Sequence, residues 1–200
     1  EVNEVCDFEV VTDKITYQGK TVILGAGARR RKLGIPGEEQ FDGKGVAYCS
    51  TCDAPVFGGK IVAVVGGGNA GLETAIDLMP YASKIYILEF ADSLKGDPIT
   101  QEKVKLSDKV EIILNAEVKE ITGDKFVNGI KYADRVSGKE KELLLEGIFI
   151  EIGAMPNSEL VKDLVDLNSK GEIVIDHKTA STSKPGIFAA GDVTDEMYKQ

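Results

Sequence analysis

Residues 61–71 read IVAVVGGGNAG, and residues 85–89 read IYILE. Residues 61–65 are apolar and rich in valine, which predicts a buried strand. The glycine-rich turn at residues 66–71 follows this strand directly. The next apolar positions recur at the spacing of one helical face: Leu72, Ala75, Ile76 and Met79. Because the run at 85–88 predicts a second buried strand, the stretch as a whole predicts a strand–turn–helix–strand unit.

The turn carries the pattern G-x-G-x-x-G after a strand and at the start of a helix, the context in which this pattern has meaning. Gly66 permits the tight turn, Gly68 lets the backbone approach a pyrophosphate, and Gly71 lets helix and strand pack closely. The N-terminus of the helix offers free N–H groups to phosphates. The sequence therefore predicts a dinucleotide site at six turn residues: Gly66, Gly67, Gly68, Asn69, Ala70 and Gly71.

Glu89 ends the second strand, where such sites place an acidic residue. A carboxylate at this position accepts hydrogen bonds from both ribose hydroxyls of NAD, and it would repel the 2′-phosphate of NADP. The next residues, Phe-Ala-Asp at 90–92, supply no arginine that would reverse this preference. We therefore expect NADH to be preferred over NADPH.

Residues 49–53 read CSTCD, a closely spaced pair of cysteines with an acid after it. Cys49 and Cys52 are spaced to form a reversible disulfide, and the thiolate is the reactive form of such pairs. Asp53 is a candidate acid or base for thiol exchange, with a helix cap or turn as the alternative role. A nicotinamide delivers a hydride, whereas a disulfide reacts through thiolates, so a flavin is the expected intermediary.

Composition excludes several classes of partner. A net charge of -9 disfavours nucleic acid and anionic membranes as partners. No apolar run approaches the ~20 residues of a membrane helix.

The chain has three cysteines, which favours a cytosolic protein over a secreted protein stabilised by disulfides. Neither Cys6 nor His177 completes a ligand-spaced cluster, so no metal is expected. The chain starts without Met or a signal peptide, which favours an excised piece of a longer protein.

The remaining patterns predict an α/β fold. Apolar runs predict strands at residues 8–12, 21–24, 110–114, 147–153, 172–175 and 186–192, the last ending in Gly-Asp. Helices are predicted at residues 98–106 and 158–164. Turn signals separate three short strands, which predicts an antiparallel meander at residues 117–121, 126–132 and 140–145. Turns or loops are predicted at residues 17–20, 29–32, 33–37 and 155–157.

Four segments occur in an order that resembles one protein family: residues 49–53, 66–71, 153–157 and 186–193. The order is similar to that of low-molecular-weight thioredoxin reductases and of the flavoprotein component of alkyl hydroperoxide reductase. Both are class II pyridine nucleotide-disulfide oxidoreductases. Residues 88–91, LEFA, look more like the latter protein or NADH-type members of the former, because NADPH-type members carry His-Arg-Arg there.

The resemblance implies a Rossmann-like nicotinamide-binding domain at residues 31–152, with a parallel sheet and a meander in three layers. Residues 1–30 and 153–200 would then be parts of a split FAD-binding domain that lacks the first FAD motif and the C-terminal helix. By the same resemblance, Gly153 would bind NAD, and Gly191, Asp192 and Gln200 would bind FAD. Cys52 would face the flavin, Cys49 would exchange with a protein partner, and Asp53 would be the acid.

These expectations describe a disulfide reductase of the EC 1.8.1 type. Electrons would pass from NADH through FAD to Cys49 and Cys52, and then to a thioredoxin, a glutaredoxin-like protein or a peroxiredoxin-reducing domain. The resemblance also implies a homodimer, and the cysteine count favours a cytoplasmic location. Two alternatives stay open: a catalytically silent NAD(H)-binding fragment of such a reductase, and a flavin-dependent ferredoxin reductase, which would not need the dithiol.

Overall fold

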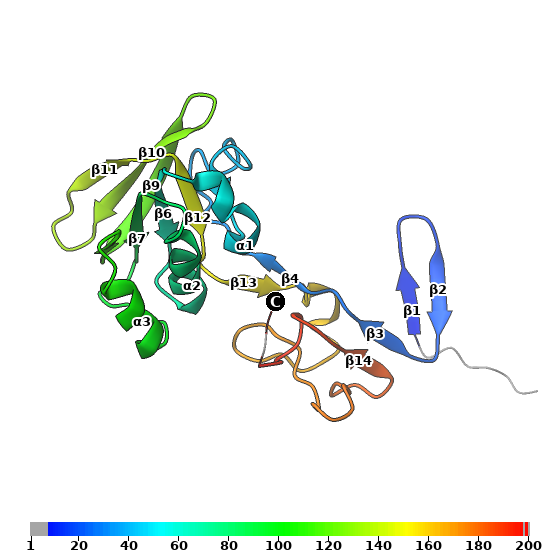
Figure 1. Cartoon of the computed structure of the whole chain (residues 1–200). Coiled ribbons are helices and arrows are strands. Elements are labelled where there is room, and N and C mark those ends of the chain that lie inside the picture. The colour runs from blue at the N-terminus through cyan, green and yellow to red at the C-terminus, as the bar shows by residue number, and fades with distance from the viewer. Residues whose placement is uncertain (1–7, 198, 200) are drawn as a thin grey trace, which may run out of the picture. The chain divides into compact units, whose positions relative to one another are not determined.

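The computed structural model describes residues 8–197 and residue 199 (Figure 1). The chain divides into two compact units, one of which is Arg30–Gly153. The other contains the described residues up to Arg29 and those from Ala154 onward. Cys6 and Gln200 lie outside the described residues. The assignment of the two units to a nicotinamide domain and to parts of an FAD domain stays a prediction.

A five-stranded parallel sheet forms the centre of the unit Arg30–Gly153. Its strands, in spatial order, are β5 (Val46–Ala47), β12 (Gly147–Ile150), β6 (Ile61–Val65), β7 (Lys84–Leu88) and β8 (Val110–Ile113). Every neighbouring pair is parallel. β6 lies at the centre and its residues from Val62 onward are buried, as expected of a strand covered on both faces. The expected α/β fold with a parallel sheet is confirmed.

Helices cover one face of this sheet (Figure 1). α2 (Asn69–Leu78) buries Leu72, Ala75 and Leu78 completely against it. α3 (Pro98–Lys105) follows β7, and the Asp97 side chain caps it by accepting a hydrogen bond from the Ile99 N–H. The apolar spacing read from the sequence is therefore the buried face of α2.

The antiparallel meander covers the opposite face (Figure 1). It is built from β9 (Ala116–Gly123), β10 (Val127–Asp134) and β11 (Glu140–Leu144), with β10 in the middle. Ile121 and Ile130 of the meander share a core with Ala63, Val65 and Ile148 of the sheet. Helices, parallel sheet and meander thus form the three expected layers.

A short helical segment carries the two cysteines between β5 and β6. It consists of α1 (Ser50–Asp53) and the 3₁₀ helix η1 (Ala54–Phe57). The Phe57 ring is buried and packs edge-on against Phe149 of β12, with ring centroids 5.0 Å apart. This contact fixes the end of the segment against the sheet, which holds the dithiol turn in place.

The second unit has short strands and a small core. Its elements are β1 (Phe8–Val11), β2 (Thr16–Gly19), β3 (Val22–Leu24), β13 (Ala154–Pro156), the 3₁₀ helix η2 (Glu159–Val161) and β14 (Ile187–Ala189). β1 and β2 form an antiparallel hairpin, and β3 pairs in parallel with β14. Apolar residues around Ile173 and Ile187 form the core. β4 (Ala28–Arg30) pairs with β13.

Several local predictions for this part of the chain were wrong. The predicted turn at 17–20 overlaps strand β2. The hairpin instead turns at Thr12, whose hydroxyl oxygen accepts hydrogen bonds from the N–H groups of Lys14 and Ile15. The predicted loop at 29–32 and turn at 155–157 overlap strands β4 and β13, which pair with each other. Such pairing joins distant parts of the chain, so local patterns do not reveal it.

Two further predictions overestimated regular structure. The predicted helix at 158–164 contains only the 3₁₀ turn η2. The predicted strand at 172–175 is reduced to single bridges at Ile173. The Asn168 side chain accepts hydrogen bonds from the N–H groups of Lys170 and Glu172, so the chain is still in a turn where the predicted strand begins.

Candidate nucleotide and dithiol site

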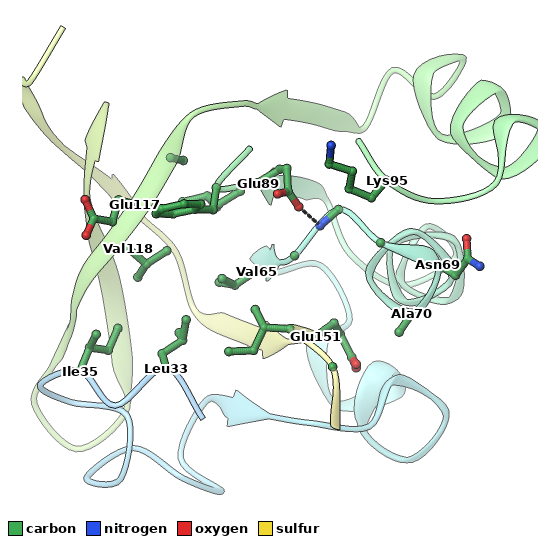
Figure 2. A pocket seen from close by; sticks show the side chains of 18 residues that line it. Leu33, Ile35, Val65, Asn69, Ala70, Glu89, Lys95, Glu117, Val118 and Glu151 are labelled. Carbon is green, nitrogen blue, oxygen red and sulfur yellow. Dashed lines mark hydrogen bonds between the residues drawn. The ribbon is translucent and has the colours of Figure 1, made fainter. Parts of the chain in front are cut away.

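A cavity of about 660 Å³ opens at the carboxyl ends of three strands of the parallel sheet (Figure 2). The glycine turn follows β6, Glu89 follows β7, and Glu151 and Gly153 follow β12. Leu33 and Ile35 of the loop before β5 line the cavity as well. Ligands of parallel α/β sheets bind at the carboxyl ends of the strands, so this cavity has the position of a nucleotide site.

The backbone of the turn requires its glycines. Gly66 has φ 117°, and a Cβ atom there would collide with the carbonyl oxygen of Glu151. A Cβ on Gly71 would collide with the carbonyl oxygen of Gly66. Gly68 caps α2 without a side-chain hydrogen bond, so the first N–H groups of the helix have no capping side chain. A Cβ on Gly68 would meet nothing within 4 Å, so this side of the turn is open to a ligand.

Two backbone N–H groups fix the side chain of Glu89. One oxygen accepts a hydrogen bond from the Gly67 N–H at 2.5 Å, drawn as the dashed line in Figure 2, and the other accepts from the Ala91 N–H at 2.8 Å. The residue is 9% exposed. The structure therefore holds this carboxyl group beside the glycine turn, where the predicted ribose contact requires it.

The two cysteines lie at the start and in the middle of α1. Cys49 is the N-cap residue and is half-buried, Cys52 is exposed, and both are free thiols. Their sulfur atoms are 2.8 Å apart. The hydrogen bond to Cys49 and the charge of that residue raise the pKa of Cys52, with smaller contributions from burial and Asp53. The pair is thus placed to react as a unit.

Asp53 is the last residue of α1, and its side chain makes no capping hydrogen bond to η1. It lines a second cavity of about 440 Å³, together with Phe57, Lys60 and Glu146. Helix capping therefore does not account for this side chain. Its expected role in proton transfer stays a prediction.

Sequence reasoning missed Glu151, a buried carboxyl group at the edge of the cavity. Thr74 of α2 donates a hydrogen bond to it at 3.2 Å, and Arg30 forms an ion pair with it at 3.4 Å. Burial raises the pKa of Glu151, against the opposite effects of Arg30 and Thr74. A charged residue within the apolar run GIFIEIG was the signal that could have identified it.

Other residues that line the cavity come from the loop after β7 and from strand β9. They include Phe90 and Lys95, which follow β7, and Glu117 and Val118 of β9. The loop after β7 lies over the glycine turn, because the N–H groups of Lys95 and Gly96 both donate to the carbonyl of Gly67. No local sequence pattern links these residues to the turn.

The remaining predicted residues fall in two places. Gly153 lines the nucleotide cavity with φ 94°. Gly191 and Asp192 belong to the other unit and follow β14, at the carboxyl end of the parallel pair β3–β14. Gly191 has φ 79°, and its carbonyl accepts hydrogen bonds from the N–H and the hydroxyl of Thr194. The expected contacts of these two residues with FAD stay predictions.

Metal-binding clusters and membrane-spanning helices are both missing from the part of the chain that the structure describes. Among residues 8–197 and 199, no group of three or more His, Cys, Asp and Glu side chains is arranged to hold a metal ion. Of the helices that the structure describes, none has the length and apolar character needed to cross a membrane.

A nucleotide cavity on a parallel sheet and a dithiol turn in the same unit are typical of nicotinamide-dependent disulfide oxidoreductases. The chain matches the family described as pyridine nucleotide-disulphide oxidoreductase over residues 2–200, and it belongs to that family.

The chain is also similar to individual proteins with names or solved structures. The chain is 51% identical to a protein named NADH dehydrogenase from Bacillus subtilis (strain 168) and 50% identical to the F component of alkyl hydroperoxide reductase from Staphylococcus aureus (strain MRSA252). Each match covers 92% of this chain and 36% of the relative. Lactococcus lactis thioredoxin reductase superposes with a TM-score of 0.83 at 34% identity, covering 96% of this chain and 63% of that chain. The predicted resemblance is confirmed.

Proposed function

We propose that this chain is the nucleotide-binding and dithiol part of a flavoprotein disulfide reductase. In this function NADH would supply the electrons, FAD would carry them when bound, and the Cys49–Cys52 disulfide would receive them. The resulting dithiol would then reduce a thioredoxin-like, glutaredoxin-like or peroxiredoxin-reducing protein. One observation carries the proposal. In the unit Arg30–Gly153, helix α2 lines the nucleotide cavity with Asn69 and Ala70, and the dithiol helix α1 contacts the same helix. The Ser50 hydroxyl of α1 donates a hydrogen bond to Asp77 of α2 at 2.8 Å.

The proposed preference for NADH rests on Glu89. Its fixed carboxyl group has acceptors for two ribose hydroxyls and repels a 2′-phosphate. The name NADH dehydrogenase, carried by the Bacillus subtilis relative, supports the same choice. The residues of the turn fit the nucleotide as well, because the start of α2 offers uncapped N–H groups to the pyrophosphate.

The residues of this chain supply the thiol chemistry. When bound, FAD supplies two-electron transfer between nicotinamide and thiol. Reduction of the Cys49–Cys52 disulfide takes two electrons and two protons and gives two thiols, with Asp53 as the group that handles a proton. The Cys49 thiolate then attacks the disulfide of the partner, forming a mixed disulfide and releasing one partner thiolate. Attack by Cys52 releases the second, so the partner is reduced and the Cys49–Cys52 disulfide forms again.

Cysteine variants of the longer, flavin-containing protein test this mechanism. Cys49→Ser and Cys52→Ser are each expected to abolish NADH-dependent reduction of a thioredoxin-fold substrate, while NADH oxidation by ferricyanide continues through the flavin. Cys6→Ser, which removes the third cysteine of this sequence, is the matched control and is expected to keep full activity. Full disulfide reductase activity in Cys49→Ser would refute the mechanism. The Cys52→Ser variant is further expected to trap the partner as a mixed disulfide.

A second candidate function is NAD(H) binding without reductase activity. It is favoured by the length of the chain, which spans 36% of its curated relatives. An absorbance spectrum separates the two: flavin bands near 380 and 450 nm, of the order expected for bound oxidised flavin, support the reductase. A colourless protein that still binds NADH supports the second function. Cytoplasmic location and homodimeric assembly stay predictions, and light scattering of the purified protein tests the latter.

A further inference from the structure

We propose that Phe90 and Arg135 together form the platform on which the adenine ring of the bound dinucleotide stacks. The inference rests on the proposed function, because it concerns the nucleotide that the cavity at the glycine turn accepts. It assigns a role in binding to Phe90 and a positioning role to Arg135, a residue distant in sequence.

The position of Phe90 is the first reason. Phe90 directly follows Glu89 and lines the nucleotide cavity, yet 54% of the residue is exposed. If Glu89 binds the ribose of the adenosine half, the base joined to that ribose lies next to Glu89. A large aromatic ring left exposed at this point has the surface that a planar base covers.

The support behind the ring is the second reason. The guanidinium carbon of Arg135 lies 3.8 Å from the centroid of the Phe90 ring, and its Nη1 donates a hydrogen bond to the Phe90 carbonyl at 2.8 Å. One cation therefore holds both the ring and the backbone of the same residue. An exposed aromatic side chain is ordinarily mobile, whereas this one is supported on one face.

The backbone around the pair is tied together as well. The Arg135 N–H donates to the Asn115 carbonyl at 2.8 Å, and the Asn115 N–H donates to the Ala91 carbonyl at 2.9 Å. Asn115 has φ 55°, the left-handed conformation that asparagine tolerates better than most residues. These hydrogen bonds join the ends of β7, β8 and β10, so Arg135 is fixed where it meets Phe90. The ring is thus pre-organised for stacking.

A tryptophan reporter tests the stacking directly, because the chain contains no tryptophan. In Phe90→Trp, saturating AMP is expected to quench the fluorescence of the single indole. Phe126→Trp is the matched control, since Phe126 is 67% exposed and lies outside the nucleotide cavity, and its fluorescence is expected to stay constant. Unchanged fluorescence of Phe90→Trp, at AMP concentrations that calorimetry shows to be saturating, would overturn the platform.

Binding constants of truncated ligands provide the second test. Phe90→Ala is expected to weaken the binding of NADH and of AMP about tenfold, the order of one base–aromatic stack, and to leave the binding of reduced nicotinamide mononucleotide unchanged. Phe90→Leu, which keeps an apolar side chain without a ring, is expected to behave like Phe90→Ala. An equal loss for nicotinamide mononucleotide would show that the ring does not act on adenine and would overturn the proposal.

Arg135 variants complete the test. Arg135→Ala is expected to weaken NADH and NADPH binding by the same factor, and Arg135→Lys by a smaller one, because a lysine keeps the cation near the ring. A much larger loss for NADPH would identify Arg135 as a contact of the 2′-phosphate and overturn the platform. If the wild-type chain binds neither NADH nor AMP, the proposed function fails; if it binds both and the variants bind equally well, only the platform fails.

Discussion

Glu89 makes hydrogen bonds to the backbone of its own unit and is proposed to make others to the nucleotide. Glu89→Gln keeps the length of the side chain and one acceptor oxygen, but it removes the charge. We expect the affinity for NADH to fall about tenfold, the order of a lost hydrogen bond to a charged group. We expect the affinity for NADPH to rise or stay constant, because the repulsion of the 2′-phosphate is relieved. Calorimetric titration of both nucleotides measures the ratio of affinities.

Glu73→Gln is the control for this charge change, since Glu73 is exposed on α2 and does not line the cavity. It removes one negative charge from the same unit and is expected to leave both affinities unchanged. An unaltered ratio of NADH to NADPH affinity in Glu89→Gln would assign the selection of nucleotide to other residues.

Glu151 connects the cavity to the pH dependence of stability. Burial raises its pKa above the ordinary value of 4.5. The folded chain therefore binds this proton more tightly than the unfolded chain, and the contribution is lost as the pH rises from 4.5 through the folded-state pKa. In Glu151→Gln the side chain stays neutral and can still accept the hydrogen bond from Thr74. The variant is expected to gain stability relative to the wild type as the pH rises.

Urea denaturation from about pH 4 to about pH 7, across the range in which a buried carboxyl group titrates, measures this difference. The same series on Glu73→Gln provides an exposed carboxyl group for comparison. Parallel stability curves for the wild type and Glu151→Gln would show that Glu151 does not titrate in this range.

At the scale of elements, the dithiol helix depends on one aromatic contact. α1 has only four residues and no side-chain cap, so it is too short to be stable alone. Phe57, at the end of the following 3₁₀ helix, is 5% exposed and packs on Phe149. Phe57→Ala is expected to lower the free energy of unfolding by about 3–5 kcal/mol, the usual cost of removing a buried aromatic side chain. Chemical denaturation measures the change.

Phe126→Ala gives the matched comparison, because Phe126 is largely exposed and its loss is expected to cost less than about 0.5 kcal/mol. Phe57→Leu is expected to fall between the two, since it keeps most of the buried volume. A cost for Phe57→Ala as small as that for Phe126→Ala would mean that the contact does not hold α1 against the sheet.

Elements were predictable where the chain pairs with its near neighbours. The unit β6–α2–β7 follows from apolar runs, a glycine turn and helical spacing within one stretch, and the structure confirms it. β4 and β13 were not predictable, because three-residue strands gain their stability from pairing with each other across more than a hundred residues. Propensity alone is too weak to identify such strands.

The same difference holds for the residues of the candidate site: some lie in contiguous motifs, and others are brought together only by the fold. The glycine turn, Glu89 and the CSTCD stretch are contiguous motifs whose spacing carries a chemical meaning. Leu33, Phe90 and Glu151 reach the cavity from three different segments, and only the order of strands in the sheet brings them together. The sequence therefore predicted the groups proposed for the chemistry, but it did not predict the residues that line the cavity around them.

At the scale of the whole molecule, the nucleotide cavity belongs to one unit. Every residue that lines it, from Leu33 to Gly153, lies within Arg30–Gly153. Two interactions join the beginning and the end of residues 30–153. Arg30 forms an ion pair with Glu151, and the Arg31 N–H donates a hydrogen bond to the Gly153 carbonyl. Its two cores lie on opposite faces of one sheet and need no residue from elsewhere.

Residues 30–153 expressed alone are therefore expected to fold and to bind NADH within about threefold of the affinity of the 200-residue chain, because every residue that lines the cavity lies in this unit. Circular dichroism and NADH fluorescence titration measure both properties, with the Glu89→Gln variant of the same segment as the control for specific binding. Loss of NADH binding in a folded segment would show that the other unit contributes to the nucleotide site. Retained binding would mean that the other unit of this chain is not needed to hold the nucleotide.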